Sequence, residues 1–259
     1  MGTRPIGMFD SGVGGLSVLI EVKKIIPKEN FVFLADQANI PYGDKTKSQL
    51  KKLSQNITRF LLKHNIKLLV IACNTASCYT IDYLREKFSI PIVGVVPAIK
   101  PATKLAKNGR IAVLSTPATS QSAYLKKLIE NVAPRAQVLR LGCVGLEEAV
   151  EQLKKAEIAR LLKIYLKKVN DLGADAVVLG CTHYPFLKKD IAEIVGKNVN
   201  ILDSGKAIAE RVSDILEKNR MRSPQKLSDL FFTTGNPGQF SKIASTLLKY
   251  KIDSQKALL

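Results

Sequence analysis

The sequence predicts an α/β protein with two similar lobes, each a mostly parallel sheet flanked by helices. Short runs rich in Val, Ile, Leu and Phe alternate with longer segments of helical periodicity, which is the pattern of parallel α/β sheets. The same order of elements returns after about 106 residues, which indicates an internal repeat. With 259 residues, 46% of them hydrophobic, the chain can bury one large core or two modest ones.

Short apolar runs of the buried-strand type define this repeat. The first set lies at residues 4–9, 31–35, 67–72 and 92–96, with helices expected near 14–26, 46–64 and 75–87. The second set lies at residues 110–115, 137–141, 175–180 and 199–202, with helices expected near 119–131, 146–151, 155–172 and 185–195. The intervals in the two sets are nearly the same, so each set predicts one lobe.

The tail after the second set predicts a helix near residues 205–219 and a strand at 230–234. A lone strand needs a sheet to join, so this tail completes one of the lobes. We expect the first lobe to consist of residues 1–97 and 208–259, and the second of residues 98–207.

Composition argues against several classes of protein. The formal net charge is +18, but lysine pairs are scattered over helical stretches without a basic block or an aromatic platform, which favours solvated helix faces over a nucleic-acid partner. The apolar runs fall far short of the roughly 18 residues of a membrane span, and we expect no signal peptide, because no apolar segment follows a basic start. Four cysteines without a CxxC pair, and two histidines, argue against a disulfide scaffold or a zinc site. We expect a cytoplasmic protein without a metal ion.

Polar and nucleophilic residues follow the predicted strands. In parallel sheets, ligands bind beyond the carboxyl ends of the strands. The residues at these ends are Asp10 and Ser11; Cys73, Asn74 and Thr75; Thr116; Cys181, Thr182 and His183; and Asp203 and Ser204. If the lobes face each other at these ends, the two thiols meet across one cleft, and this cleft is the predicted active site.

Two of the cysteines occupy equivalent places in the repeat. Cys73 and Cys181 each end a strand before an expected helix, where the helix dipole lowers a thiol pKa from about 8.5. Two such thiols suggest acid and base groups on opposite faces of one substrate, and His183 would tune the second thiol. Cys78 and Cys143 are interpreted as buried apolar residues. A Cys–His hydrolase would leave the duplicate thiol unexplained.

The segment from Asp10 to Ser17 is a glycine-rich turn between a strand and a helix. Its glycines, together with Asp36, imitate a dinucleotide-binding motif. However, Asp10 and Ser11 precede the glycines and no P-loop lysine follows them, so NAD is not expected. The turn instead offers backbone N–H groups and these two side chains to a small ligand.

Four motifs together resemble the glutamate racemase family. They are Phe9-Asp10-Ser11-Gly12-Val13-Gly14-Gly15, Pro41-Tyr42-Gly43, Ala72-Cys73-Asn74-Thr75-Ala76-Ser77 and Gly180-Cys181-Thr182-His183-Tyr184-Pro185. They stand in the family's order across nearly the whole chain. The resemblance implies a two-lobed α/β enzyme that interconverts L- and D-glutamate without a cofactor and supplies D-glutamate for peptidoglycan.

The resemblance also implies roles for individual residues. Cys73 and Cys181 match the catalytic cysteines, with Cys73 taking the proton from D-glutamate, and Asp10 and His183 match groups that assist them. The matched substrate-binding positions are Asp10, Ser11, Tyr42, Gly43, Asn74, Thr75, Thr116, Thr119, Thr182 and His183. Taken alone, Tyr42 and Gly43 indicate either an ordinary turn or a phenol and an N–H group for a carboxylate.

Around Cys143 the sequence departs from the family's pattern, because Val144 replaces the usual Pro. Glu151 keeps the spacing of the family's helper acid. Glu147 and Glu148 are nearby rivals for that role.

Several alternatives to glutamate racemisation stay open. The related aspartate racemases would be expected to carry Glu where His183 stands, and a related decarboxylase keeps only one of the two thiols. A DNA-associated binding role would explain the basic charge. A gyrase-associated role is a further alternative that the resemblance implies, since some glutamate racemases also act on gyrase. The oligomeric state is open as well, with a homodimer as one alternative.

Overall fold

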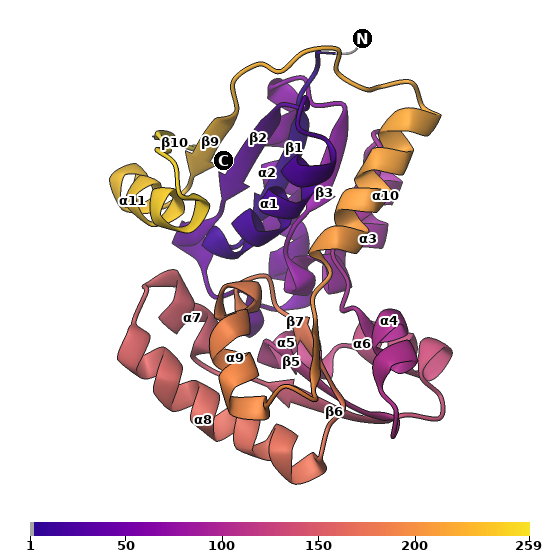
Figure 1. Ribbon diagram of the computed structural model, residues 1–259. Coiled ribbons are helices and arrows are strands. Elements are labelled where there is room, and N and C mark those ends of the chain that lie inside the picture. The colour runs from indigo at the N-terminus through magenta and orange to yellow at the C-terminus, as the bar shows by residue number, and fades with distance from the viewer. Residues whose placement is uncertain (1–2) are drawn as a thin grey trace. The chain divides into compact units, whose positions relative to one another are not determined.

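The computed structural model describes residues 3–259, whose contacts divide them into two compact units. One unit comprises the described residues up to Val95 together with Gly205–Leu259, and the other comprises Val96–Ser204. The lobe boundaries expected from the sequence lie at residues 97–98 and 207–208. Each unit has its own sheet and its own helices (Figure 1).

The described residues of the first unit form a six-stranded parallel sheet with the order β10-β9-β2-β1-β3-β4. Its strands are β1 (Ile6–Asp10), β2 (Phe31–Ala35), β3 (Leu68–Ile71), β4 (Ile92–Gly94), β9 (Leu230–Thr233) and β10 (Ser254–Lys256). The central strands are buried along their whole length. Continuous apolar runs of this kind are what a parallel sheet covered on both faces requires.

Helices and short 3-10 turns complete the first unit. They are η1 (Val13–Gly15), α1 (Leu16–Ile25), η2 (Gln37–Asn39), η3 (Tyr42–Asp44), α2 (Lys47–Lys63), α3 (Asn74–Lys87), α10 (Gly205–Lys218) and α11 (Pro237–Leu248). Helix α2 begins with a capping box, in which the Thr46 hydroxyl accepts from the Gln49 N–H and the Gln49 side chain accepts from the Thr46 N–H. Helix α1 packs against α10, and α2 packs against α3 (Figure 1).

Residues 96–204 form a four-stranded parallel sheet with the order β6-β5-β7-β8. Its strands are β5 (Arg110–Ser115), β6 (Gln137–Gly142), β7 (Ala176–Gly180) and β8 (Asn200–Leu202). The helices and one 3-10 turn are α4 (Ile99–Leu105), α5 (Pro117–Gln121), α6 (Ala123–Val132), α7 (Leu146–Glu151), α8 (Lys155–Leu172), η4 (Tyr184–Leu187) and α9 (Lys188–Val195). One core cluster packs α7, α8 and α9 on the sheet, and a second packs α4 and α6.

The two sheets share one strand order. In chain order, the first four strands are arranged 2-1-3-4, and the next four are arranged 6-5-7-8. The predicted α/β class, with two similar lobes and parallel sheets, is therefore confirmed. The strand order changes direction between β1 and β3, and again between β5 and β7. Such a switch point is where open α/β sheets bind ligands, beyond the carboxyl ends of the strands.

The tail completes the first unit, because β9 pairs with β2 and β10 pairs with β9. Three elements are not expected from the sequence, namely α4, α11 and β10. Pro101 in the first turn of α4 and Pro237 at the start of α11 resemble helix breakers, but a first turn tolerates proline because its N–H groups have no partner within the helix. Strand β10 reads Ser-Gln-Lys and depends on pairing with β9 rather than on an apolar pattern.

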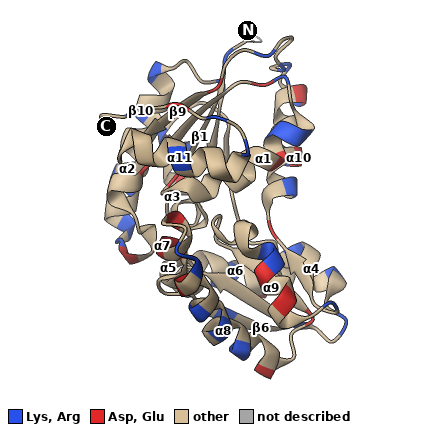
Figure 2. Cartoon of the chain, turned by 60° about the vertical axis from the view of Figure 1, so that its left-hand side comes forward, with Lys and Arg blue, Asp and Glu red and all other residues tan. Residues whose placement is uncertain are grey.

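Lys and Arg residues are distributed over the helices of both units and interspersed with Asp and Glu (Figure 2). On α8, for example, Arg160 pairs with Glu157 at 2.6 Å and Lys167 pairs with Asp171 at 2.8 Å. Among the described residues, no helix combines the length and the apolar character needed to cross a membrane.

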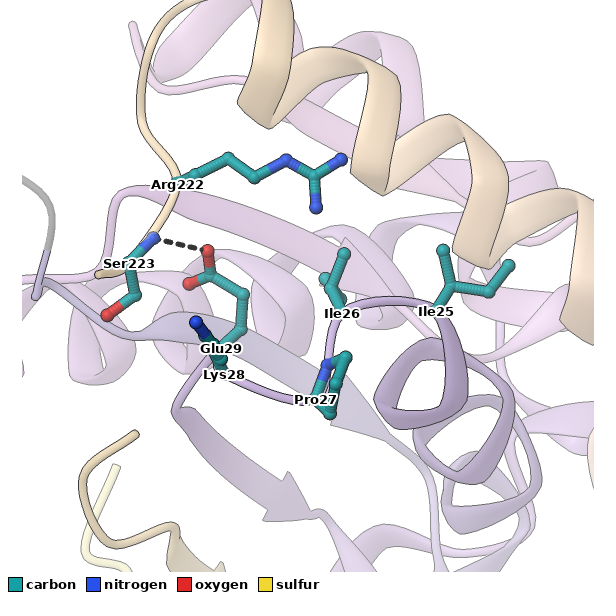
Figure 3. A pocket seen from close by; sticks show the side chains of 7 residues that line it. All are labelled: Ile25, Ile26, Pro27, Lys28, Glu29, Arg222 and Ser223. Atoms are coloured by element: carbon teal, nitrogen blue, oxygen red, sulfur yellow. Dashed lines mark hydrogen bonds between the residues drawn. The ribbon is translucent and has the colours of Figure 1, made fainter. Parts of the chain in front are cut away.

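A buried ion pair lies at the amino ends of the strands in the first unit. Glu29, just before β2, and Lys67, just before β3, are 2.5 Å apart and almost fully buried. The Ser223 N–H donates to Glu29 at 2.7 Å (Figure 3), and Lys67 donates to the Met221 carbonyl at 2.7 Å. These bonds fix the segment after α10 beside a pocket of about 190 Å³ lined by Ile25, Ile26, Pro27, Lys28, Glu29, Arg222 and Ser223. This pocket is at the opposite end of the strands from Asp10 and Cys73.

Candidate active site

In the first unit, a thiol, a hydroxyl and a carboxylate meet at the carboxyl ends of two neighbouring strands. Asp10 and Ser11 follow β1, and Cys73 follows β3, which pairs with β1. The Cys73 thiol donates to Ser11 Oγ at 3.9 Å. Ser11 in turn donates to Asp10 Oδ1 from its hydroxyl at 3.2 Å and from its N–H at 2.7 Å. All three side chains are buried, so the thiol proton is linked to a carboxylate through one hydroxyl.

The glycine-rich turn allows this close arrangement. A Cβ atom at Gly15 would lie 2.7 Å from the Asp10 Cβ and 3.2 Å from the Ala72 Cβ. Real Cβ atoms do not approach others so closely, so a larger residue would push η1 away from the ends of β1 and β3. Packing of the turn against Asp10 thus accounts for a glycine at this position.

Cys73 is the N-cap residue of α3, as the sequence predicts. Its carbonyl accepts from the Ser77 N–H at 2.9 Å, and the positive end of the helix favours a thiolate at this position. Asn74 and Thr75, in the first turn, are also buried. Within residues 3–259, the buried Asn74 Oδ1 has no hydrogen-bond partner. A buried acceptor beside a thiol is suited to a ligand that donates a hydrogen bond.

Tyr42 and Gly43 lie in η3, where Tyr42 is fully buried. The Tyr42 hydroxyl donates to Asp36 Oδ2 at 2.7 Å. Its proton is therefore engaged within the protein, whereas the sequence suggested a phenolic donor for a ligand carboxylate. Burial raises the pKa of Tyr42 well above its usual value, and the charges of Asp36, Cys73 and Asp10 raise it further.

Two buried residues in contact with this group are not singled out by the motifs. Asp36 follows β2, and Thr234 follows β9 and donates to Asp36 Oδ1 at 2.7 Å. Asp36 carries the same signal as Asp10, namely an acidic residue directly after a buried strand. The sequence assigned it only to an imitation of a dinucleotide motif, although the rule about strand ends applies to it equally.

In the second unit, Cys181, Thr182 and His183 follow β7, beside β5. The Cys181 Sγ lies 3.7 Å from His183 Nδ1, and His183 Nε2 lies 2.7 Å from Glu151 Oε2. Cys181 and Glu151 are almost fully buried, and His183 is fully buried. A thiol, an imidazole and a carboxylate thus form a linear series of contacts.

The expectation that the pKa of Cys181 is lowered is wrong. Burial raises the pKa of this thiol to about 11, and its contacts with His183 offset only part of that effect. The local structure explains the difference, because Cys181 is followed by the turn η4 and α9 begins only at Lys188. The thiol therefore lacks the helix N-terminus that Cys73 has, and it is protonated at neutral pH.

His183 has the opposite balance of effects. Burial acts to lower its pKa, but hydrogen bonds and charge interactions with Cys181 and Glu151 raise the pKa well above 6.5. The Glu151 carboxylate at Nε2 therefore favours the protonated imidazole. A protonated imidazole in this position stabilises the thiolate form of Cys181 and so lowers the pKa of that thiol.

Among the three candidate helper acids, Glu151 is the one that contacts His183. Glu147 is buried on the same helix and Glu148 is half-buried. Helix α7, which carries all three, starts after Gly145, whose φ of +78° favours glycine. Cys143 is packed in the core of the unit, and burial raises its pKa to about 12, in agreement with its interpretation as an apolar residue.

Thr116 and Thr119 lie at the start of α5. Thr116 is the N-cap, accepting from the Thr119 N–H at 3.2 Å and donating to the Thr119 hydroxyl at 3.1 Å. Because Ser115 and Gly180 are paired in the sheet, Thr116 and Cys181 follow neighbouring strands at the same edge. In residues 3–259, no three His, Cys, Asp or Glu side chains are grouped as metal ligands would be.

Comparison with known proteins gives a consistent result. Residues 22–212 match the family model described as Asp/Glu/Hydantoin racemase. The glutamate racemase of Herpetosiphon aurantiacus is 41% identical over 251 residues, covering 95% of this chain and 99% of that protein.

Solved structures of glutamate racemases also resemble this chain. A glutamate racemase from Bacillus anthracis matches with a TM-score of 0.92 and 33% identity, covering 100% of this chain and 99% of the other. The Escherichia coli glutamate racemase, solved with L-glutamate and an activator, matches with a TM-score of 0.85 and 32% identity, covering 98% of each chain. The resemblance seen in the four motifs is thereby confirmed, and the chain belongs to the Asp/Glu/hydantoin racemase family.

Proposed function

We propose that this protein is a glutamate racemase that interconverts L- and D-glutamate by acid/base chemistry of Cys73 and Cys181, without a cofactor. The observation that carries the proposal is the equivalence of the two thiols. Each follows the third strand of its set in sheets of the same order, and each contacts its own series of polar groups that ends in a carboxylate. Racemisation needs such a pair, because one group removes the Cα proton and another returns a proton to the opposite face.

On the side of the first unit, Cys73 takes the proton from D-glutamate. The N-terminus of α3 favours its thiolate. Once protonated, the thiol donates to Ser11, which donates to Asp10, so the hydrogen bonds that hold the neutral form are already in place. In the reverse reaction, the same thiol gives its proton to Cα.

On the side of the second unit, Cys181 supplies the proton to the opposite face. Its pKa of about 11 keeps it as a thiol at neutral pH, which is the form that an acid needs. After the transfer, the cation of His183 stabilises the thiolate, and Glu151 holds that cation in place. With L-glutamate the roles reverse, and Cys181 acts as the base.

The intermediate carries negative charge that spreads onto the α-carboxylate. Donors from Asn74, Thr75, Thr116 and Thr182 would stabilise this charge, since preorganised donors in a site without water contribute several kcal/mol. The proposal requires that the two strand edges face one substrate from opposite sides, as expected from the sequence. Closure over the substrate would exclude water from the site.

Glutamate is the proposed substrate because the similar enzymes are glutamate racemases and one of them was solved with L-glutamate. The product D-glutamate would serve peptidoglycan synthesis. Both thiols must stay reduced for this chemistry, so we place the reaction in the reducing cytoplasm.

The test is circular dichroism of a D-glutamate solution after addition of the purified protein, with a thiol reductant and no added cofactor. We expect the signal to decay to zero, and an L-glutamate solution to decay to zero as well. A constant signal with glutamate and a decaying signal with aspartate would replace glutamate by aspartate as the substrate. Constant signals with both amino acids would contradict the proposed activity.

A second measurement tests the use of two separate groups. In deuterated water, Cys73 removes protium from D-glutamate and a deuterated Cys181 delivers deuterium from the other side. Early in the reaction, the L-glutamate formed should carry deuterium at Cα while the remaining D-glutamate keeps protium. Substantial protium in the product would indicate that one base returns the same proton.

A further inference from the structure

Asp36 is a fully buried carboxylate whose two oxygens accept hydrogen bonds from three side chains. Tyr42 donates to Oδ2 at 2.7 Å, Thr234 donates to Oδ1 at 2.7 Å, and Asn39 donates to both oxygens at 2.9 and 3.1 Å. The Asp36 N–H donates to the carbonyl of Asp10 at 2.9 Å. A carboxylate with this many donors has one orientation, and so do the groups bonded to it.

Thr234 brings the tail of the chain into this network. Strand β9 pairs with β2, with Thr233 opposite Ala35, so that Thr234 and Asp36 both follow paired residues. The Thr234 hydroxyl also accepts from the Ala38 N–H at 3.0 Å. One hydroxyl from the tail thus fixes both the carboxylate and the turn η2 that leads to Tyr42.

Tyr42 connects the network to the thiol of the first unit. Turn η3, which contains Tyr42, packs against α3, which Cys73 caps. The charges of Cys73 and Asp10 both act on the Tyr42 hydroxyl, in addition to the charge of Asp36. Movement of Tyr42 would therefore change the packing and the electrostatic surroundings of Cys73, and it would shift the loop that follows Pro41.

We propose that Asp36 and Thr234 are positioning residues for racemisation, with Thr234 fixing the Asp36 carboxylate and Asp36 fixing Tyr42, which shares a core cluster with Cys73. This inference rests on the proposed function. In this arrangement both residues act through Tyr42. The tail of the chain is then part of the catalytic apparatus and not only an extension of the sheet.

The test compares two neighbouring buried threonines. Thr234→Val removes the hydroxyl that contacts Asp36. Thr233→Val is the matched control, because Thr233 is also buried but donates to Gln37 at 2.9 Å and accepts from the Gly235 N–H at 2.9 Å. Thr234→Ser keeps the hydroxyl and removes only the methyl group. Thermal unfolding of each variant shows whether the two Val substitutions lower the stability of the protein by similar amounts.

We expect Thr234→Val to raise KM for glutamate on the order of tenfold, the size of one lost buried hydrogen bond to a charged group, with a smaller change in kcat. Thr233→Val should change KM by less than about twofold, and Thr234→Ser should restore KM. The rate at which iodoacetamide alkylates Cys73, followed by mass spectrometry, should rise in Thr234→Val only, because Tyr42 no longer packs in one place beside the thiol.

Equal effects of the two Val substitutions, or no rescue by Thr234→Ser, would overturn the inference and leave a purely structural network. The alkylation comparison needs no turnover. If the wild-type protein were inert toward glutamate, the proposed function would be contradicted. The alkylation rates of Cys73 would still test the positioning role. Unchanged alkylation of Cys73 in Thr234→Val would contradict the positioning role by itself.

Discussion

Cys73 and Cys181 follow the equivalent strand of two sheets with the same order, yet their surroundings differ. Cys73 caps α3 and donates to a hydroxyl that is bound to a carboxylate. Cys181 is followed by a 3-10 turn and contacts an imidazole that is bound to a carboxylate. The repeated topology therefore accounts for where each thiol stands, and the residues after each strand account for its proton affinity.

The difference has a chemical use. The proposed two-thiol mechanism needs one thiolate and one thiol at a time, and two identical environments would give no preference for either arrangement. In the first unit, the helix N-terminus favours a thiolate. In the second, burial favours the thiol, and the His183 cation is available when the thiolate forms. The surroundings thus favour the neutral form of Cys181, whereas the helix N-terminus at Cys73 acts in the opposite direction.

The largest expected effect comes from removing either thiol. Cys73→Ser or Cys181→Ser should lower kcat/KM on the order of 10³-fold, because a hydroxyl is a far weaker acid than a thiol and is almost never ionised near neutral pH, so it can neither give up nor take up the proton efficiently. The fall must be equal in both directions, since the enantiomers have equal free energies in water. Circular dichroism from each enantiomer measures it. A variant that keeps more than about a tenth of the activity would show that the two thiols are not both needed.

A smaller effect is expected at the carboxylate of the second unit. Glu151→Gln removes the charge that helps raise the pKa of His183, so this pKa should fall toward 6.5. Activity should then fall about tenfold near pH 8.5 and less near pH 6.5, where the imidazole still carries a proton. The measurement is the pH profile of kcat. Glu148→Gln on the same helix is the control, and an equal loss in both variants would exclude the contact with His183 as the cause.

The two histidines provide a comparison of stability between the units. The pKa of His183 is raised, so its contribution to folding is fully present below about pH 6.5 and is lost as pH rises through its folded pKa. Burial lowers the pKa of His64, which packs between Phe60 and Phe232. The unfolded chain therefore binds that proton more readily, and the contribution of His64 is lost as pH falls below about 6.5.

Urea unfolding of the wild type, His183→Asn and His64→Asn over a series of pH values tests these signs. The difference between the wild type and His183→Asn should shrink as pH rises. The difference between the wild type and His64→Asn should shrink as pH falls. Slopes of the same sign would show that the two histidines do not differ in the way the structure indicates.

Much of the fold could be predicted because the sequences of buried parallel strands are continuous apolar runs. Helix α4, helix α11 and strand β10 could not, because their formation depends on first-turn prolines and on a partner strand. The ends of the strands predicted the residues of the candidate site. The contact between Glu151 and His183 spans 32 positions and that between Asp36 and Thr234 spans 198, and no local pattern encodes such distances.

The pKa of Cys181 shows why chemistry is harder to predict than position. From the sequence, the two thiols looked alike, each at a strand end before a helix. Tyr184 and Pro185 begin a 3-10 turn instead, and burial then controls the thiol. Dipole effects fall off within the first turn of a helix, so a delay of a few residues is enough to remove them.

The smallest effect on activity is expected at Cys143, the other buried thiol of the second unit. Its Sγ donates to the Leu141 carbonyl at 3.8 Å, and its raised pKa of about 12 keeps it neutral. Because both thiols are neutral at pH 7, Cys143→Ala should leave the pKa of Cys181 nearly unchanged and turnover within about twofold of the wild type. The unfolding free energy should fall by about 1 kcal/mol through lost packing. Urea unfolding and circular dichroism measure the two effects. If turnover instead fell as far as in Cys181→Ser, the second unit would hold two functional thiols, and the one-to-one correspondence between the units would break.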